Sequence, residues 1–158
     1  MLFRSDRARL NRAMIAQALS DTPFITMAYA LFNWRTGAFQ FARAGHPYPL
    51  YLPRNGEPIL WQLEGSLLGV FDTRYQVQSH QLQPGDKLLL YTDGIDAGAF
   101  GTHAVGLPSL LAAAEHYRRL PIGEMVDRLA SDLFGQTQQS DDLTVLGFEM
   151  LDQNSGTW

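Results

Sequence analysis

The segment Lys87-Leu88-Leu89-Leu90-Tyr91-Thr92-Asp93-Gly94-Ile95 organises the chain, because an apolar run ends there in a carboxylate and a glycine. Four consecutive apolar or aromatic residues predict a strand that is buried on both faces. The preceding segment, Gln83-Pro84-Gly85-Asp86, is typical of a tight turn. We therefore expect Asp93 at the end of a well-anchored strand, with Gly94 allowing the backbone to turn sharply or to approach a ligand. A simple surface turn is the alternative for Asp-Gly.

The periodicity of apolar residues predicts strands on both sides of this stretch and helices after it. Segment 24–32 has almost no polar face and predicts a central strand. Segment 75–82 alternates and is expected to form a hairpin with the strand that starts at Lys87. Further strands are predicted at 38–43, 48–52, 59–63 and 143–150, and helices from residue 5 or 6 to about 20, at 108–117 and at 122–134. This order predicts one α+β domain over residues 1–152 and a frayed tail at 153–158.

The composition is that of a globular protein with a sizeable core. The chain has 158 residues, of which 46% are hydrophobic and 18% are charged. A net charge of -4 argues against a nucleic-acid partner. The absence of cysteine excludes disulfides, thiolate zinc sites and cysteine nucleophiles. Residues 1–6 contain charges and no apolar run is long enough to cross a bilayer, so we expect a cytoplasmic protein without a membrane segment.

Two adjacent acids, Asp141 and Asp142, precede the last predicted strand. Neighbouring carboxylates repel each other, and a bound cation would offset that repulsion. A solvated loop tip is the alternative. Together with Asp93 they would form an oxygen-only ligand set, which suits Mg²⁺ or Mn²⁺ better than zinc. His46 is a further candidate, although a turn residue that hydrogen-bonds the backbone is the simpler interpretation.

Four motifs along the chain resemble the PPM/PP2C-type phosphatases of the SpoIIE and RsbU branch. They occur in that family's order, and the resemblance covers nearly the whole chain from about Leu10. The motifs are Ala44-Gly45-His46-Pro47, Leu68-Gly69, the segment from Leu82-Gln83-Pro84-Gly85-Asp86 to Leu89-Leu90-Tyr91-Thr92-Asp93-Gly94-Ile95, and Asp141-Asp142-Leu143-Thr144-Val145.

The resemblance implies a β-sandwich of largely antiparallel sheets flanked by helices. It also implies hydrolysis of phosphoserine or phosphothreonine on a protein, typically an anti-sigma-factor antagonist, with two Mn²⁺ or Mg²⁺ ions. By position, Asp93 resembles the metal-binding acid of the Thr-Asp-Gly motif, Asp141 stands at the usual ligand position, and Asp142 stands where many relatives have Asn. Gly45 and His46 match a hallmark that is expected to shape a loop. No side chain is assigned a catalytic role.

The sequence also departs from the family pattern. The family's earlier Asp-x-x-Gly-His-Gly segment, whose Asp bridges the two metals, has no counterpart before Leu10, and Ala97 stands where a later acid is usual, with Asp96 one position early. We therefore expect an N-terminally truncated phosphatase domain that is weak or inactive as this chain and that self-associates through an exposed sheet edge. The alternatives are a non-catalytic phosphatase-like binding module and a structural domain whose acids are only turn residues.

Overall fold

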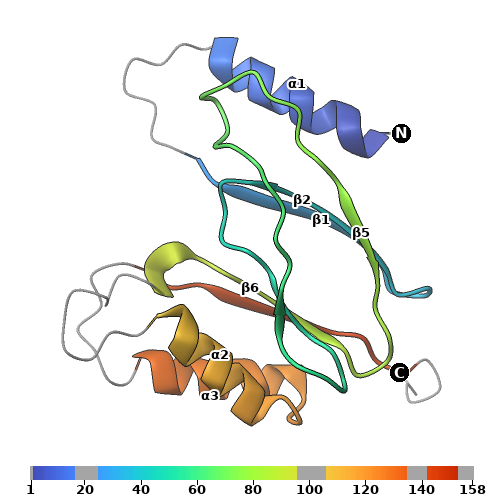
Figure 1. Ribbon diagram of the computed structural model, residues 1–158, viewed down its shortest axis with the longest axis vertical. Coiled ribbons are helices and arrows are strands. Elements are labelled where there is room, and N and C mark those ends of the chain that lie inside the picture. Colours follow the sequence, from blue (N-terminus) through green and yellow to red (C-terminus); the bar gives the residue numbers. More distant parts are fainter. Residues whose placement is uncertain (1, 17–24, 96–105, 135–141, 153–158) are drawn as a thin grey trace. The chain divides into compact units, whose positions relative to one another are not determined.

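The computed structural model describes residues 2–16, 25–95, 106–134 and 142–152 (Figure 1). Within these ranges the strands form two antiparallel sheets accompanied by helices, which confirms the predicted α+β class. The elements are α1 (Leu2–Ala16), β1 (Met27–Asn33), β2 (Ala38–Ala44), β3 (Leu50–Leu52), β4 (Ile59–Leu60), β5 (Gln78–Gln81), β6 (Lys87–Tyr91), the 3-10 turn η1 (Asp93–Ile95), α2 (Leu107–Tyr117), α3 (Ile122–Phe134) and β7 (Val145–Glu149).

The chain divides into two compact units, each built on one of the sheets. Residues 1–46 and 62–82 form the first unit, and residues 47–61 and 83–158 form the second. A single domain over 1–152 stays a prediction, and the expected tail at 153–158 lies outside the described residues. No helix in the described ranges combines the length and the apolar character that a membrane span requires.

The first unit consists of the sheet β1-β2-β5, helix α1 and the long segment before β5. Phe39 and Phe41 of β2 are almost fully buried. Asn11 of α1 is buried as well, and its side-chain amide donates to the Phe71 carbonyl and accepts from the Gly69 backbone N–H, each at 2.8 Å. A buried amide with both functions satisfied fixes α1 to this segment.

The prediction that segment 24–32 forms a central strand was wrong. In the described sheet, β1 pairs along its length only with β2 and is therefore an edge strand. Tyr29 and Leu31, on one face of β1, are 38% and 47% exposed. An apolar run indicates burial but does not specify how many neighbours a strand has, which explains the error.

The predicted hairpin between 75–82 and the strand from Lys87 was also wrong. β5 pairs with β2, whereas β6 pairs with β3 and β7 in the other sheet. The expected turn does form, with Gly85 at a φ of 89° and the Asp86 N–H bonded to the Gln83 carbonyl at 2.9 Å. This turn connects a strand of one sheet to a strand of the other. The prediction failed because the alternation pattern of a strand does not identify the strand with which it pairs.

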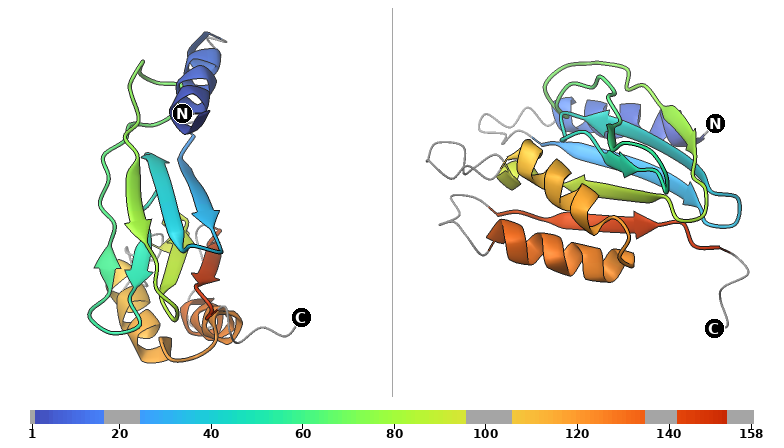
Figure 2. Two further views of the ribbon diagram at one scale, coloured as in Figure 1. Left: turned by 90° about the vertical axis from the view of Figure 1, so that its right-hand side faces the viewer. Right: turned by 60° about the horizontal axis from the view of Figure 1, so that its bottom comes forward.

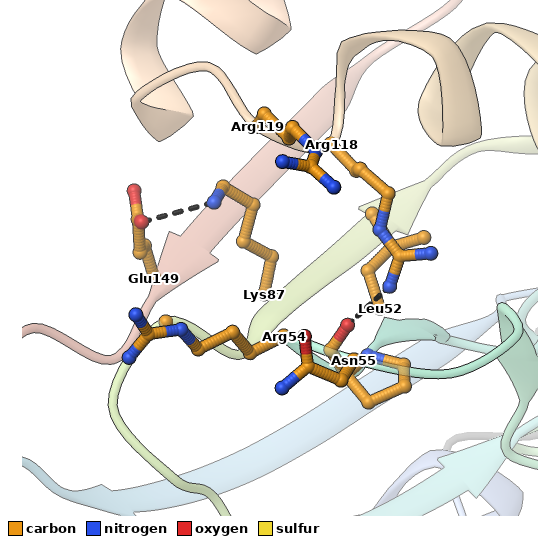
Figure 3. Close-up of a pocket in the computed structure, with 9 residues that line it drawn as sticks. Leu52, Arg54, Asn55, Lys87, Arg118, Arg119 and Glu149 are labelled. Atoms are coloured by element: carbon orange, nitrogen blue, oxygen red, sulfur yellow. Dashed lines mark hydrogen bonds and ion pairs between the residues drawn. The ribbon is translucent and has the colours of Figure 1, made fainter.

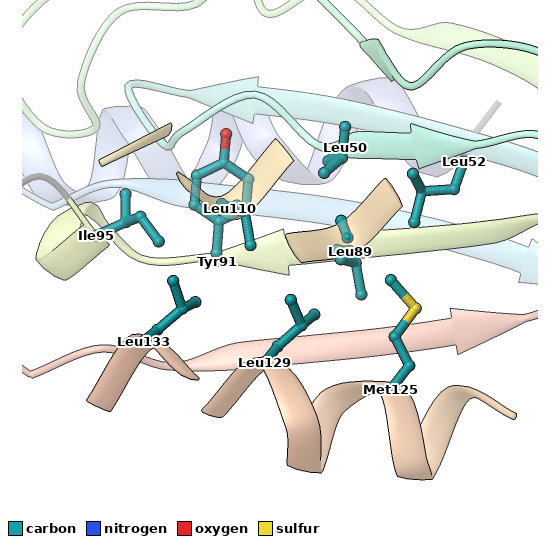
Figure 4. Packing of buried hydrophobic residues seen from close by; sticks show 10 residues of the cluster. Leu50, Leu52, Leu89, Tyr91, Ile95, Leu110, Met125, Leu129 and Leu133 are labelled. Atoms are coloured by element: carbon teal, nitrogen blue, oxygen red, sulfur yellow. The ribbon is translucent and has the colours of Figure 1, made fainter. Parts of the chain in front are cut away.

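The second unit contains the sheet β4-β3-β6-β7, and α2 and α3 cover one face of it (Figures 1 and 2). β6 lies inside this sheet and is buried along nearly its whole length, as predicted. α2 and α3 begin and end within one residue of their predicted bounds. Their apolar faces pack on the sheet to form the core of this unit (Figure 4), which includes Leu50, Leu52, Leu89, Tyr91, Ile95, Leu110, Ala114, Met125, Leu129 and Leu133.

Candidate metal site

Asp93 lies just beyond the end of β6, where the ladder with β7 stops. The last pair of that ladder joins Tyr91 to Val145. Asp93 then opens the turn η1, whose last residue, Ile95, is only 1% exposed and belongs to the core of the unit. The carboxylate therefore stands on an anchored turn while its own residue remains exposed to solvent.

Thr92 ties the end of β6 to the segment that leads into β7. Its backbone N–H donates to the Thr144 carbonyl at 3.0 Å, and its hydroxyl oxygen accepts from the Thr144 N–H at 2.9 Å. The same hydroxyl donates to the Asp142 carbonyl at 3.2 Å. One side chain thus satisfies two main-chain groups of the facing segment and extends the contact of the strands past their ladder.

Gly94 packs directly on the backbone of the acidic segment. A Cβ atom added at Gly94 would lie 2.4 Å from the Asp142 carbonyl oxygen and 3.1 Å from the Leu143 Cα. Such distances leave no room for any side chain. The close approach at Gly94 is therefore made to the main chain of the segment in which further ligands were predicted, and the expected approach to a ligand stays a prediction.

The described part of this site supplies two carboxylates, those of Asp93 and Asp142, both on exposed residues. Asp141, the third predicted ligand, lies outside the described residues. Among the residues that the structure describes, no three or more His, Asp or Glu side chains form a group that could hold a metal ion. An oxygen-only donor set on two held backbone segments fits part of a Mg²⁺ or Mn²⁺ site, and the assignment of the three ligands stays a prediction.

The loop at Gly45 and His46, in the first unit, has the geometry of a shaped turn. Gly45 adopts a φ of 65°, and an added Cβ would lie 2.4 Å from the Leu67 Cδ2. The His46 carbonyl accepts from the Arg43 Nε, and the His46 Nδ1 lies 3.2 Å from the Thr26 hydroxyl oxygen. These contacts agree with a loop-shaping role for both residues.

A second group of polar side chains gathers near the other end of β6, and sequence reasoning missed it. We call it the basic pocket, a cavity of about 500 Å³ within the second unit (Figure 3). No local motif marked it, because its residues come from four segments that are far apart in the sequence. Its lining is Leu52, Pro53, Arg54, Asn55, Gly85, Lys87, Arg118, Arg119 and Glu149.

Comparison with known proteins places this chain in a family. A family model described as Stage II sporulation protein E (SpoIIE) matches residues 7–151. The chain belongs to the SpoIIE family. A relative of this SpoIIE-family chain is the phosphoserine phosphatase RsbU of Bacillus subtilis (strain 168), with 29% identity over 142 residues. That match covers 87% of this chain and 42% of RsbU, so the chain spans less than half the length of that relative.

Solved structures with the same fold include a PP2C domain and a phosphatase domain. The SiaA-PP2C domain of Pseudomonas aeruginosa superposes with a TM-score of 0.72 at 23% identity, over 88% of this chain and 57% of that one. The phosphatase domain of SpoIIE from Bacillus subtilis, presoaked with manganese, gives a TM-score of 0.63 at 19% identity, over 92% of this chain and 65% of that one. The SpoIIE-family chain therefore has a PP2C-type fold.

Proposed function

We propose that this chain is a metal-dependent phosphoserine or phosphothreonine protein phosphatase domain, with Asp93, Asp141 and Asp142 as ligands of Mn²⁺ or Mg²⁺. The observation that carries the proposal is the packing of Gly94 and Thr92 on the Asp142 segment, which brings two acid-bearing turns together. The relative RsbU is a phosphoserine phosphatase, and the SpoIIE domain was solved after a manganese presoak, which supports the same chemistry here.

The residues of the site suit this chemistry in three ways. Divalent ions, when bound, supply Lewis acidity and an activated water for attack on phosphorus. Asp93 and Asp142 offer oxygen ligands that solvent and a phosphorylated side chain can reach, because both residues are exposed. Thr92 holds the two turns at a fixed separation through the main chain. No protein nucleophile is required, which agrees with a chain that has no cysteine.

The substrate in this proposal is a phosphorylated protein of the anti-sigma-factor-antagonist type, dephosphorylated in the cytoplasm during partner switching. We expect weak or no turnover by this chain alone. Two or three carboxylates carry too little negative charge to offset two divalent ions at close distance.

The test is a Mn²⁺ titration of thermal stability, combined with hydrolysis of a phosphoserine protein. A bound ion at about 100 times its Kd stabilises a folded protein by about 2.7 kcal/mol. We expect the Mn²⁺-induced rise in Tm to be lost in Asp93→Asn. It should be kept in Asp127→Asn, which alters an exposed acid on α3. An unchanged Tm in the unsubstituted chain would contradict the metal site, and rapid Mn²⁺-dependent turnover would contradict the expected weak activity.

A non-catalytic binding module is the second candidate. It is favoured by the count of only two acids in the described part of the site, Asp93 and Asp142. Asp93→Asn separates the two functions, since it should leave partner binding intact in a binding module. In a phosphatase it should weaken Mn²⁺ binding and any residual hydrolysis together.

We also propose self-association through the edge of β1. Exposed Tyr29 and Leu31 on an edge strand offer apolar surface and backbone groups to a second copy. Sedimentation at increasing concentration should show a dimer that Leu31→Lys weakens, with Gln76→Lys, at an exposed position before β5, as the control. A monodisperse monomer at high concentration would contradict the proposal.

A further inference from the structure

The basic pocket is strongly positive although the chain as a whole is acidic. Its lining contains four basic side chains and one acidic side chain, an excess of three positive charges, in a chain with a net charge of -4. The charged groups come from the β3–β4 connection, from β6 and β7, and from the α2–α3 connection, and Figure 3 shows them around one space. Charges drawn from separate segments onto one cavity concentrate the local potential.

Two of the four cations already have acidic partners. The Lys87 Nζ lies 2.9 Å from the Glu149 Oε1, and both side chains are largely buried. Arg118 pairs with Glu115, outside the pocket lining, at 2.8 Å. Neither pair leaves charge for a ligand to neutralise.

Arg54 and Arg119 have no such partner among the residues that the structure describes. Both residues are exposed, and in the part of the chain that the structure describes no acidic group lies within ion-pair distance of either guanidinium. The Asp86 carboxylate lies near Arg54, but it is buried and accepts from the Tyr51 hydroxyl and from the Arg54 and Gln83 backbone N–H groups. The pocket therefore contains two guanidinium groups for which the described ranges supply no counter-charge.

The walls that carry these guanidinium groups are held in place before any ligand arrives. Arg118 donates to the Gly56 carbonyl at 2.7 Å and also to the Pro53 carbonyl, so it ties the β3–β4 connection to the end of α2. In the turn before β6, an added Cβ at Gly85 would lie 2.9 Å from the Arg54 Cδ, which shows that the Arg54 stem packs against that turn. A preformed cationic pocket loses little conformational entropy on binding.

We propose that the basic pocket binds a phosphate group, either free or as part of a small phosphomonoester. Two uncompensated guanidinium groups match the charge of a phosphate dianion, and each can donate two hydrogen bonds to its oxygens. A carboxylate has one charge and two oxygens, so it satisfies only one guanidinium. The cavity of about 500 Å³ is in the range of small-ligand pockets and leaves room for an organic group on the phosphate.

The test measures binding of inorganic phosphate, O-phosphoserine, adenosine monophosphate and acetate to the whole chain by calorimetry in EDTA. EDTA removes divalent ions, so a phosphate bound through a metal at the Asp93 end makes no contribution. We expect phosphate-bearing ligands to bind at least about tenfold more tightly than acetate. Tighter binding of a phosphomonoester than of inorganic phosphate would identify the organic ester as the ligand, and equal or weaker binding would identify the free ion.

The variant Arg54→Gln/Arg119→Gln should weaken phosphate binding by about tenfold or more. Arg128→Gln is the matched control, because Arg128 is an exposed arginine on α3 outside the pocket. It should change the affinity by less than about twofold. A circular dichroism melt of each variant establishes that it is folded. No phosphate binding, equal affinity for acetate, or equal losses in both variants would each overturn the proposal.

Discussion

The two ends of β6 are built by different means. At the Asp93 end, the main chain makes the contacts, through Gly94 and through the hydrogen bonds of Thr92 to the facing segment. At the Lys87 end, buried side chains make them, above all Asp86, which is 3% exposed. Asp93 and Asp142 at the first end are exposed, whereas the Lys87–Glu149 ion pair at the second end is largely buried. We therefore expect the Asp93 end to be disrupted by adding a side chain at Gly94, and the Lys87 end by removing the side chain of Asp86.

The largest effect should come from Asp86→Ala. It removes the acceptor of three hydrogen bonds, from the Tyr51 hydroxyl and from the Arg54 and Gln83 backbone N–H groups. Losing three hydrogen bonds to a carboxylate that is 3% exposed should lower the free energy of unfolding by about 3 kcal/mol. Chemical denaturation measures the loss, and Asp127→Ala on the exposed face of α3 should change stability by less than about 0.5 kcal/mol.

Asp86→Ala should keep its response to Mn²⁺, although it is destabilised. A metal site that depends only on the contacts beyond Tyr91 should still raise Tm on Mn²⁺ addition in this variant, after correction for its lower starting value. Loss of the Mn²⁺ response along with the stability would show that the two ends are one cooperative structure.

Gly94→Ala tests the opposite end and should cost about 2 kcal/mol of stability, because the new methyl group overlaps the Asp142 carbonyl oxygen. It should also remove the Mn²⁺ response, since it separates the two acid-bearing turns. Gly123→Ala is the matched control, because an added Cβ there meets nothing within 4 Å and lies in a helix. That control should raise stability by about 0.5 kcal/mol. Equal behaviour of the two variants would contradict the role given to Gly94.

The same difference between the ends explains what the sequence could predict. Strand 87–91 and the helices after it follow from local patterns, namely an apolar run and a helical period. The position of the 24–32 strand in its sheet and the partner of the 75–82 strand depend on pairing between distant segments, and both predictions were wrong.

The basic pocket had no sequence signal for a related reason. Arg54 and Arg119 are 65 positions apart, and neither stands in a motif. Only the folded β3–β4 and α2–α3 connections bring them to one cavity with Lys87. An arginine in a sequence is most often an exposed, solvated side chain. Whether its charge is neutralised depends on which acids lie near it in the fold. The ligand role of Asp141 remains a prediction.

The smallest effect at neutral pH should come from Tyr51→Phe, which loses the hydrogen bond to Asp86 and about 1 kcal/mol. The main effect of this substitution is expected on the stability of the protein at alkaline pH. Burial raises the pKa of Tyr51, and the hydrogen bond to Asp86 and the negative charge of that carboxylate raise this pKa further above its ordinary value of 10.0. Because the folded-state pKa of Tyr51 exceeds the unfolded one, the stabilisation is complete below about pH 10 and is lost as the pH rises above that value.

Tm measured from about pH 8 to about pH 11 should therefore fall more steeply in the unsubstituted chain than in Tyr51→Phe. Tyr29→Phe, at an exposed position in the other sheet, should keep the steep fall. A slope unchanged by Tyr51→Phe would show that Asp86 does not hold the neutral phenol in the folded state.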